Sequence, residues 1–122
     1  MATVLVIDDD PQMRRMVARV LAGAGFRVLE AADGRKGVRL FRDHRPEVIL
    51  TDILMPEQEG LETIRELRRE APGVAIIAMS GEGQTGTMQF LDFATKLGAD
   101  AALAKPFRAA QLIEAVARLL PG

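Results

Sequence analysis

The feature that most constrains this chain is a regular alternation between short apolar runs and segments with helical periodicity. Five runs have the composition of buried strands: Thr3–Ile7, Arg27–Ala31, Val48–Thr51, Ala75–Met79 and Ala101–Ala104. The first and the fourth are continuous apolar runs, as expected of strands that helices cover on both faces. The fifth is mostly alanine, and its place in the alternation is the main reason to predict a strand there.

The segments that follow the runs carry apolar residues at helical spacing. In the first, the apolar stripe consists of Met13, Met16, Val17, Val20 and Leu21. The other stripes are Val38 with Phe41, Leu61–Leu67, Phe90–Leu97 and Leu112–Leu120. Asp10 and Asp33 stand where helix-capping carboxylates are expected, and Gly98 stands where a helix should end. These patterns predict five helices.

Strictly alternating strands and helices favour an α/β fold, in which parallel strands are joined by right-handed crossovers. In such doubly wound sheets, ligands bind in the crevice at the carboxyl ends of the strands. The residues that follow each strand are therefore the ones most informative about function.

Length and charge exclude several classes of protein. A chain of 122 residues fits one domain. Its 16 Lys and Arg against 17 Asp and Glu lack the basic excess of a nucleic-acid-binding protein. Cysteine is absent and there is one histidine, which excludes zinc sites built from these residues. No membrane span or signal peptide is visible, so we expect a cytoplasmic protein without a membrane partner.

Polar or charged side chains follow four of the five predicted strands. Asp8, Asp9 and Asp10 follow the first strand, Asp52 the third, Ser80 the fourth and Lys105 the fifth. Because the ends of parallel strands share one edge of the sheet, these groups should converge. Crowded carboxylates repel one another unless a cation compensates them. Oxygen ligands without His or Cys favour a hard divalent ion, Mg²⁺ by preference.

This set of groups suits phosphoryl transfer, which depends mainly on positioning and charge neutralisation. One carboxylate can act as the nucleophile and form an acyl phosphate, while Lys105 and Ser80 contact phosphoryl oxygens. Each residue also has a simpler interpretation. Asp10 before Pro11 is more typical of a helix cap than of a metal ligand. Asp52 is the hardest to explain structurally, because a carboxylate at the end of an apolar strand loses hydration.

These residues resemble the receiver domain of bacterial two-component response regulators along essentially the whole chain, residues 1–122. The matching segments are VLVIDDDP (4–11), VILTDILMP (48–56), Gly60, IIAMSG (76–81), GAD (98–100) and AKPF (104–107). The resemblance implies a flavodoxin-like, five-stranded parallel sheet of order 2-1-3-4-5 with five helices, a fold for which CheY, a member of this family, is a standard example.

The resemblance also implies roles for single residues. Asp52 corresponds to the phosphoacceptor. Asp9 corresponds to a direct Mg²⁺ ligand, Asp8 to one acting largely through water, and Leu54 to a residue whose backbone carbonyl contacts the metal. With Asp52 they form the expected Mg²⁺ site.

Ser80 and Lys105 correspond to the residues that contact the phosphoryl group, and the Lys105–Pro106 bond is expected to be cis. The implied donor is a sensor histidine kinase or a histidine phosphotransfer protein. The implied result is a change of conformation that regulates a downstream protein or a dimer through the face of helix 4, strand 5 and helix 5. The chain would promote its own phosphorylation and dephosphorylation without being an enzyme in the ordinary sense.

The chain departs from the family at three places. Ala102 stands where the family often has an aromatic switch residue, and the chain has no tyrosine. Gln58-Glu59 replaces a common Met-Asp pair. The segment 81–89 is longer than usual and rich in glycine, which favours a flexible loop. We hypothesise that signalling still runs through this loop and helix 4, where Phe90 and Phe93 supply the missing bulk.

Two other functions remain open from the sequence. Asp8-x-Asp10 superficially resembles the nucleophile motif of haloacid-dehalogenase-like phosphatases, although Gln12 does not fit it and Asp52 is left unexplained. A pseudo-receiver that binds a partner without being phosphorylated is the third possibility. The chain is either a stand-alone regulator or part of a longer protein.

The remaining charged residues have the pattern of ordinary surface. Arg14-Arg15 lie near the start of the first helix. On the third helix, Arg65, Arg68 and Arg69 alternate with Glu62, Glu66 and Glu70, which predicts exposed ion pairs along the helix.

Overall fold

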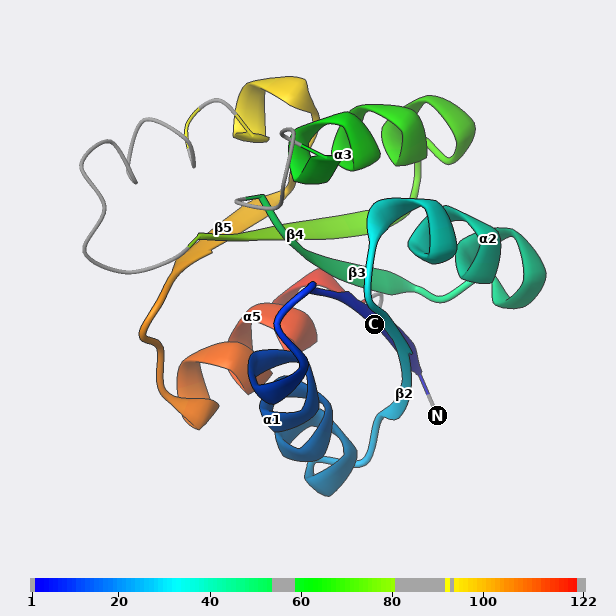
Figure 1. Cartoon of the computed structure of the whole chain (residues 1–122). Helices are drawn as coiled ribbons and strands as arrows, with labels where there is room; N and C mark the ends of the chain where they lie inside the picture. The colour runs from blue at the N-terminus through cyan, green and yellow to red at the C-terminus, as the bar shows by residue number, and fades with distance from the viewer. Residues whose placement is uncertain (1, 54–58, 81–91, 93, 121–122) are drawn as a thin grey trace.

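The five predicted strands form one parallel sheet in the order β2-β1-β3-β4-β5 (Figure 1). The computed structural model describes residues 2–53, 59–80, 92 and 94–120. The strands are β1 (Thr3–Ile7), β2 (Arg27–Ala31), β3 (Val48–Asp52), β4 (Ala75–Ser80) and β5 (Ala101–Ala104). The doubly wound topology predicted from the sequence is therefore confirmed.

Two strands extend one residue beyond their apolar runs. Asp52 pairs with Met79, and Ser80 pairs with Ala104, so both polar residues belong to the sheet itself. The backbone ladder continues for as long as neighbouring strands run alongside, whatever the side chain. As a result, the backbone at Asp52 and Ser80 is held by the sheet, as that of a loop residue would not be.

The described helices are α1 (Pro11–Gly23), α2 (Gly34–His44), α3 (Glu59–Glu70) and α5 (Ala109–Leu119). Asp10 caps α1 by accepting a hydrogen bond from the Gln12 amide at 3.0 Å, and Asp33 caps α2 through Lys36. None of the helices in the described ranges combines the length and the apolar composition that crossing a bilayer requires.

The helix predicted around Phe90–Leu97 is described only in part. Residues 92 and 94–97 are helical, and Gly98 follows them with φ +129°, as predicted for a helix end. Phe90 and Phe93 lie outside the described residues.

The sheet separates two hydrophobic cores, because successive strand side chains point to opposite faces. Helices α2 and α3 cover one face and α1 and α5 the other (Figure 1). The strand residues in the first core include Leu5, Ile7, Ile49, Ile76 and Ala78. Those in the second include Val4, Val6, Val48, Leu50, Ile77 and Met79. Both cores reach the edge at which the strands end, which gives that edge a rigid base.

Among the side chains that the structure describes, those of α3 form no ion pair along the helix of the kind that the sequence predicted. Arg68 donates to the carbonyl oxygens of Gly98, Pro72 and Val74 at 2.7–2.9 Å, and to Asp100 Oδ2 at 2.6 Å. Its guanidinium therefore joins the end of α3 to the segments that precede β4 and β5. Helical spacing could not reveal these partners, because three of the four are backbone carbonyls.

Two acids of α3 pair with a neighbouring helix. Glu66 and Glu70 both reach Arg42 of α2, at 3.7 and 2.9 Å. The hydrogen bond from Arg42 lowers the pKa of the Glu70 carboxyl, and the same bond raises the pKa of Arg42. These contacts link α2 to α3 at the surface.

Candidate functional site

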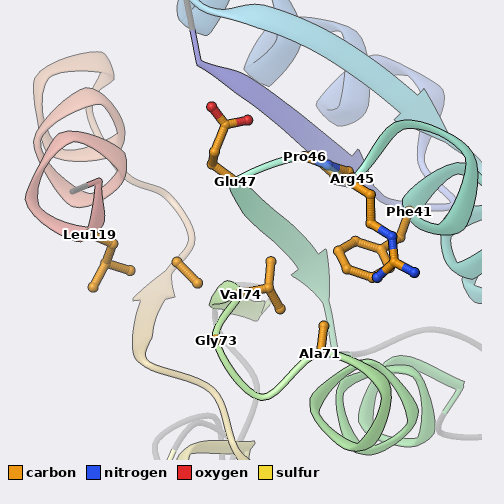
Figure 2. A pocket seen from close by; sticks show the side chains of 9 residues that line it. Phe41, Arg45, Pro46, Glu47, Ala71, Gly73, Val74 and Leu119 are labelled. Carbon is orange, nitrogen blue, oxygen red and sulfur yellow. The ribbon is translucent and has the colours of Figure 1, made fainter.

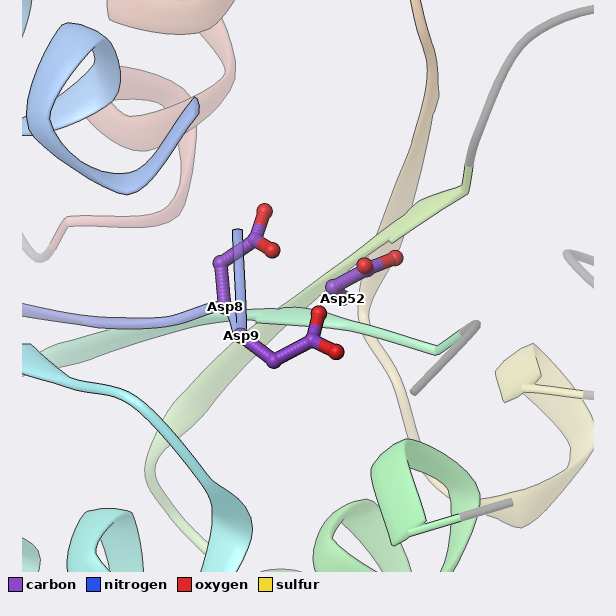
Figure 3. Close-up of side chains that lie close together, drawn as sticks. All are labelled: Asp8, Asp9 and Asp52. Carbon is purple, nitrogen blue, oxygen red and sulfur yellow. The ribbon is translucent and has the colours of Figure 1, made fainter. Parts of the chain in front are cut away.

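The predicted site residues meet at the carboxyl edge of the sheet. Asp8 and Asp9 directly follow β1, and Asp52 ends β3 (Figure 3). One carboxylate oxygen from each of the three lies within 4.8 Å of the others. Asp8 is fully buried and Asp52 is 6% exposed, whereas Asp9 is exposed. Two buried carboxylates and one accessible carboxylate thus face a common point.

The Asp8 residue is held from several directions. Its Oδ1 accepts a hydrogen bond from the Asp10 amide at 2.9 Å, and its Oδ2 accepts one from Lys105 Nζ at 3.1 Å. Its own amide donates to the Ala31 carbonyl at the end of β2. The buried carboxylate is therefore charge-paired and hydrogen-bonded, as a buried charge requires.

Lys105 brings a positive charge to the acidic cluster. Its ammonium lies 3.1 Å from Asp8 and 3.6 Å from Asp52, and its side chain is 10% exposed. Its backbone amide donates to the Ser80 carbonyl at 2.8 Å, and the Lys105–Pro106 bond is cis, as expected. Three carboxylates against one ammonium leave an excess of two formal negative charges. A bound divalent cation would balance this excess.

Ser80 contributes a hydroxyl without a partner. Its Oγ is buried and makes no hydrogen bond within the part of the chain that the structure describes. Leaving a buried hydroxyl unpaired costs about 1–3 kcal/mol, so such a group is a candidate for binding a ligand or an ordered water. This hydroxyl is free to bond an anionic oxygen that arrives at the site.

The backbone of Asp52 is fixed by a close approach from α3. A Cβ built on Gly60 would overlap the carbonyl oxygen of Asp52 and lie 2.5 Å from the Cα of Ile53. Only a residue without a side chain lets the first turn of α3 pass this close. Gly60 thereby belongs to the support of the site, although it carries no reactive group.

The remaining positions that the sequence singled out are Asp10, Ala102, Leu54 and the segment 81–89. Asp10 serves as the cap of α1 and points its carboxylate at the helix amides Gln12 and Met13, consistent with its structural interpretation. Ala102 is exposed on β5, so the structure places no large side chain there. Leu54 and the segment 81–89 lie outside the described residues.

Sequence reasoning missed Arg14 and Glu30. The guanidinium of Arg14 donates to the backbone carbonyl of Asp8 at 3.0 Å and to the Glu30 carboxylate at 3.1 Å. The Arg14 side chain is 15% exposed, so it is not the surface residue that its neighbour Arg15 is. The signal that could have found it was its place in the first turn after the acidic residues.

The donor set fits Mg²⁺. Three carboxylates converge without any His or Cys, and oxygen ligands of this kind are those that Mg²⁺ prefers. The buried Ser80 hydroxyl and the Lys105 ammonium beside them suit the phosphate oxygens that usually accompany this ion.

A second hollow lies at the opposite edge of the sheet (Figure 2). It has a volume of about 370 Å³ and lies between Phe41, Glu47, Val74 and Leu119. Its charged groups are already engaged: Arg45 lies 5.0 Å above the Phe41 ring, and Glu47 accepts a hydrogen bond from the Thr3 amide. The carboxyl edge is therefore the stronger candidate for chemistry.

The chain is similar to known proteins along nearly its whole length. Residues 4–117 match the family described as the response regulator receiver domain. The chemotaxis protein CheY of Thermotoga maritima is 34% identical over 114 residues, which make up 93% of this chain and 92% of that protein. CheY of Bacillus subtilis is 33% identical over 118 residues, 96% of each chain. The crystal structure of a receiver domain protein from Clostridium thermocellum matches with a TM-score of 0.89 at 30% identity, covering 98% of this chain and 94% of that one.

Proposed function

The chain belongs to the response regulator receiver domain family, and we propose that it is a Mg²⁺-dependent phosphorylation switch with Asp52 as its phosphoacceptor. The observation that carries the proposal is the setting of Asp52. Its carboxylate lies beside the Asp8 and Asp9 carboxylates and 3.6 Å from the Lys105 ammonium. The proposed nucleophile, the proposed cation site and an ammonium that can neutralise charge therefore lie in one small region.

In the proposed reaction, a carboxylate oxygen of Asp52 attacks the phosphorus of the donor. A new oxygen–phosphorus bond forms as the bond to the leaving group breaks, and the leaving group departs with the electron pair. Lys105 would neutralise one phosphoryl oxygen and the Ser80 hydroxyl would donate a hydrogen bond to another. Asp8, Asp9, Asp52 and the Leu54 carbonyl would hold the Mg²⁺, which supplies further neutralisation of phosphoryl charge.

The proposed donor is a phosphohistidine of a sensor kinase or of a phosphotransfer protein, and the proposed location is the cytoplasm. Phosphorylation would shift the chain between two states that differ in affinity for a downstream protein or a second copy. A ligand or modification shifts such an equilibrium only through different contacts in the two states. We place the recognition surface on the helix predicted around Phe90–Leu97, on β5 and on α5.

The test uses acetyl phosphate as a small-molecule donor and intact-protein mass spectrometry as the readout. We expect the wild-type chain to gain the mass of one phosphoryl group in the presence of Mg²⁺ and to stay unmodified without it. Asp52→Asn should not gain this mass. Asp10→Asn is the matched control, because Asp10 is a nearby carboxylate that caps α1, and it should be phosphorylated like the wild type.

Two outcomes would contradict the proposal and favour the alternatives. Repeated hydrolysis of acetyl phosphate that survives Asp52→Asn and is lost in Asp8→Asn would indicate a phosphatase with Asp8 as its nucleophile. A wild-type chain that stays unmodified with Mg²⁺ present would indicate a binding module that is not phosphorylated.

A further inference from the structure

Arg14 is the one basic side chain of α1 that turns back toward the acidic cluster and is largely buried there. Its Nη1 donates to the Asp8 carbonyl oxygen at 3.0 Å, and its Nε donates to Glu30 Oε1 at 3.1 Å. The two bonds use different nitrogens of one planar group, so the carboxylate of Glu30 on β2 holds the guanidinium in the orientation that meets the carbonyl. Arg14 is 15% exposed and Glu30 is 39% exposed.

Asp9 depends on this contact more than its neighbours do. The Asp8 carboxylate is held through its own oxygens by the Asp10 amide and by Lys105. Asp9 is exposed, and its carboxylate makes no hydrogen bond or ion pair with any residue that the structure describes. Its direction therefore follows from the backbone. The carbonyl that Arg14 holds belongs to the peptide group that joins Asp8 to Asp9.

We propose that Arg14, anchored by Glu30, is a positioning residue that fixes the peptide between Asp8 and Asp9 so that Asp9 faces Asp52 across the divalent cation site. The inference rests on the proposed function, since it concerns the same Mg²⁺ site. The preceding peptide group, which joins Ile7 to Asp8, is already tied to β2, because the Asp8 amide donates to the Ala31 carbonyl. Arg14 completes the restraint from α1.

Charge and geometry predict opposite effects on metal binding when Arg14 is replaced. Removing a positive charge near a cation site should strengthen Mg²⁺ binding, because repulsion decreases. Removing the restraint on Asp9 should weaken Mg²⁺ binding, because the ligand must then be ordered when the ion binds. The direction of the change therefore separates the two explanations without any assay of phosphorylation.

The experiment measures Mg²⁺ affinity by amide NMR titration of the unphosphorylated chain. We expect Arg14→Gln to bind Mg²⁺ about tenfold more weakly than the wild type, the size typical of losing a group that orients a metal ligand. Arg15→Gln is the matched control: Arg15 is the next residue, is exposed and has no hydrogen bond or ion pair among the described residues. It should bind Mg²⁺ as the wild type does or slightly more tightly.

The double variant Arg14→Gln/Glu30→Gln has the net charge of the wild type. If Arg14 acts by position, the double variant should bind Mg²⁺ as weakly as Arg14→Gln, because Glu30 acts through Arg14. Phosphorylation by acetyl phosphate should then approach the wild-type maximal rate when Mg²⁺ is raised to saturation. A role confined to fold stability would lower the melting temperature of Arg14→Gln and leave its Mg²⁺ affinity unchanged.

Unchanged or tighter Mg²⁺ binding by Arg14→Gln would overturn the inference, as would wild-type affinity in the double variant. Neither result touches the proposed function, which fails only if wild-type Asp52 is not phosphorylated. If Arg14→Gln does not fold, Glu30→Gln and Glu30→Asp replace it. Both should weaken Mg²⁺ binding, and the charge-conserving Glu30→Asp rules out a pure charge effect. Wild-type affinity in Glu30→Asp would then overturn the inference.

Discussion

Gly60 shows how a residue without a side chain supports a reactive one. It lets the first turn of α3 pass against the carbonyl of Asp52 and the Cα of Ile53. We expect Gly60→Ala to lower the free energy of unfolding by about 1–3 kcal/mol, because backbone rather than a flexible side chain must move. It should also slow phosphorylation by acetyl phosphate, because the backbone that moves carries Asp52.

Gly23 provides the matched control, since it also lies in a helix but has open space around its Cβ position. Gly23→Ala should leave the free energy of unfolding unchanged or raise it by up to about 0.5–1 kcal/mol, because the full gain in helix propensity belongs to a helix interior and Gly23 is the last residue of α1. Urea denaturation measures both values. A Gly60→Ala variant as stable as the wild type would show that α3 can withdraw from Asp52 at no cost.

We expect Lys105 to stabilise the metal-free chain and to weaken the binding of Mg²⁺. Its ammonium is the cation closest to the buried Asp8 carboxylate, at 3.1 Å. Lys105→Met should lower the free energy of unfolding in metal-free buffer by about 3 kcal/mol, since it leaves buried carboxylates without their counter-charge.

The same variant should bind Mg²⁺ more tightly, and Mg²⁺ should raise its melting temperature more than that of the wild type. Thermal denaturation with and without Mg²⁺ measures both effects. Arg118→Gln, which breaks the exposed pair with Glu114, is the control and should change neither. Equal Mg²⁺ effects in Lys105→Met and the wild type would contradict this account.

Arg68 links α3 to the segments that precede β4 and β5. Its guanidinium bonds the carbonyls of Gly98, Pro72 and Val74, and Asp100 also accepts the Ile76 amide at 2.8 Å. We expect Arg68→Met to lower the free energy of unfolding by about 2–3 kcal/mol, since several partly buried acceptors lose a charged donor.

Arg69→Met is the control for this substitution. Arg69 is exposed on the same helix and has no hydrogen bond or ion pair within the described part of the chain. It should leave the urea midpoint close to that of the wild type. Equal effects of the two substitutions would mean that the contacts of Arg68 add nothing beyond helix propensity.

The elements themselves could be predicted because their signals are local. Strand composition, helical spacing and the capping carboxylates of Asp10 and Asp33 each depend on neighbours in sequence. The exact ends of β3 and β4 could not be predicted, because the hydrogen-bonded ladder of the sheet extends past the last apolar residue of each strand to Asp52 and Ser80. The convergence of the predicted site residues at one edge of the sheet was predictable from their positions after the strands, whereas their roles stay a prediction.

The contacts of Arg14 and Arg68 were not predictable. Their partners are mainly backbone carbonyls, whose positions depend on how distant segments pack. The sequence around an arginine says where its helix face points and nothing about which carbonyls will lie there. This is why both residues had the pattern of ordinary surface and proved to be structural.

The proposed phosphorylation of Asp52 must alter a surface elsewhere on the molecule in order to change the affinity for a partner. Ala102 is exposed and has only a methyl group, so a turning aromatic ring on β5 is excluded. We predict that the beryllofluoride mimic of a phosphoryl group shifts backbone amide resonances in residues 81–97, with Phe90 and Phe93 among them. Backbone NMR with and without the mimic measures this. Shifts confined to other segments would overturn the hypothesis.

Asp52→Asn is the control for that measurement, because it removes the carboxylate to which we expect the mimic to bind. It should show no shift in the same residues at the same concentration of beryllofluoride. A shift that persists in this variant would come from binding elsewhere.

The direct bond from the Lys105 amide to the Ser80 carbonyl, described above, makes the tips of β4 and β5 one mechanical unit. A phosphoryl oxygen that attracts the Ser80 hydroxyl or the Lys105 ammonium would therefore move the carboxyl ends of β4 and β5 together. The outer strand of this pair, β5, has three alanines among its four residues and therefore little side-chain area to unpack. A small displacement at the carboxyl end of β5 can therefore be transmitted along the strand without disrupting the packing of either hydrophobic core.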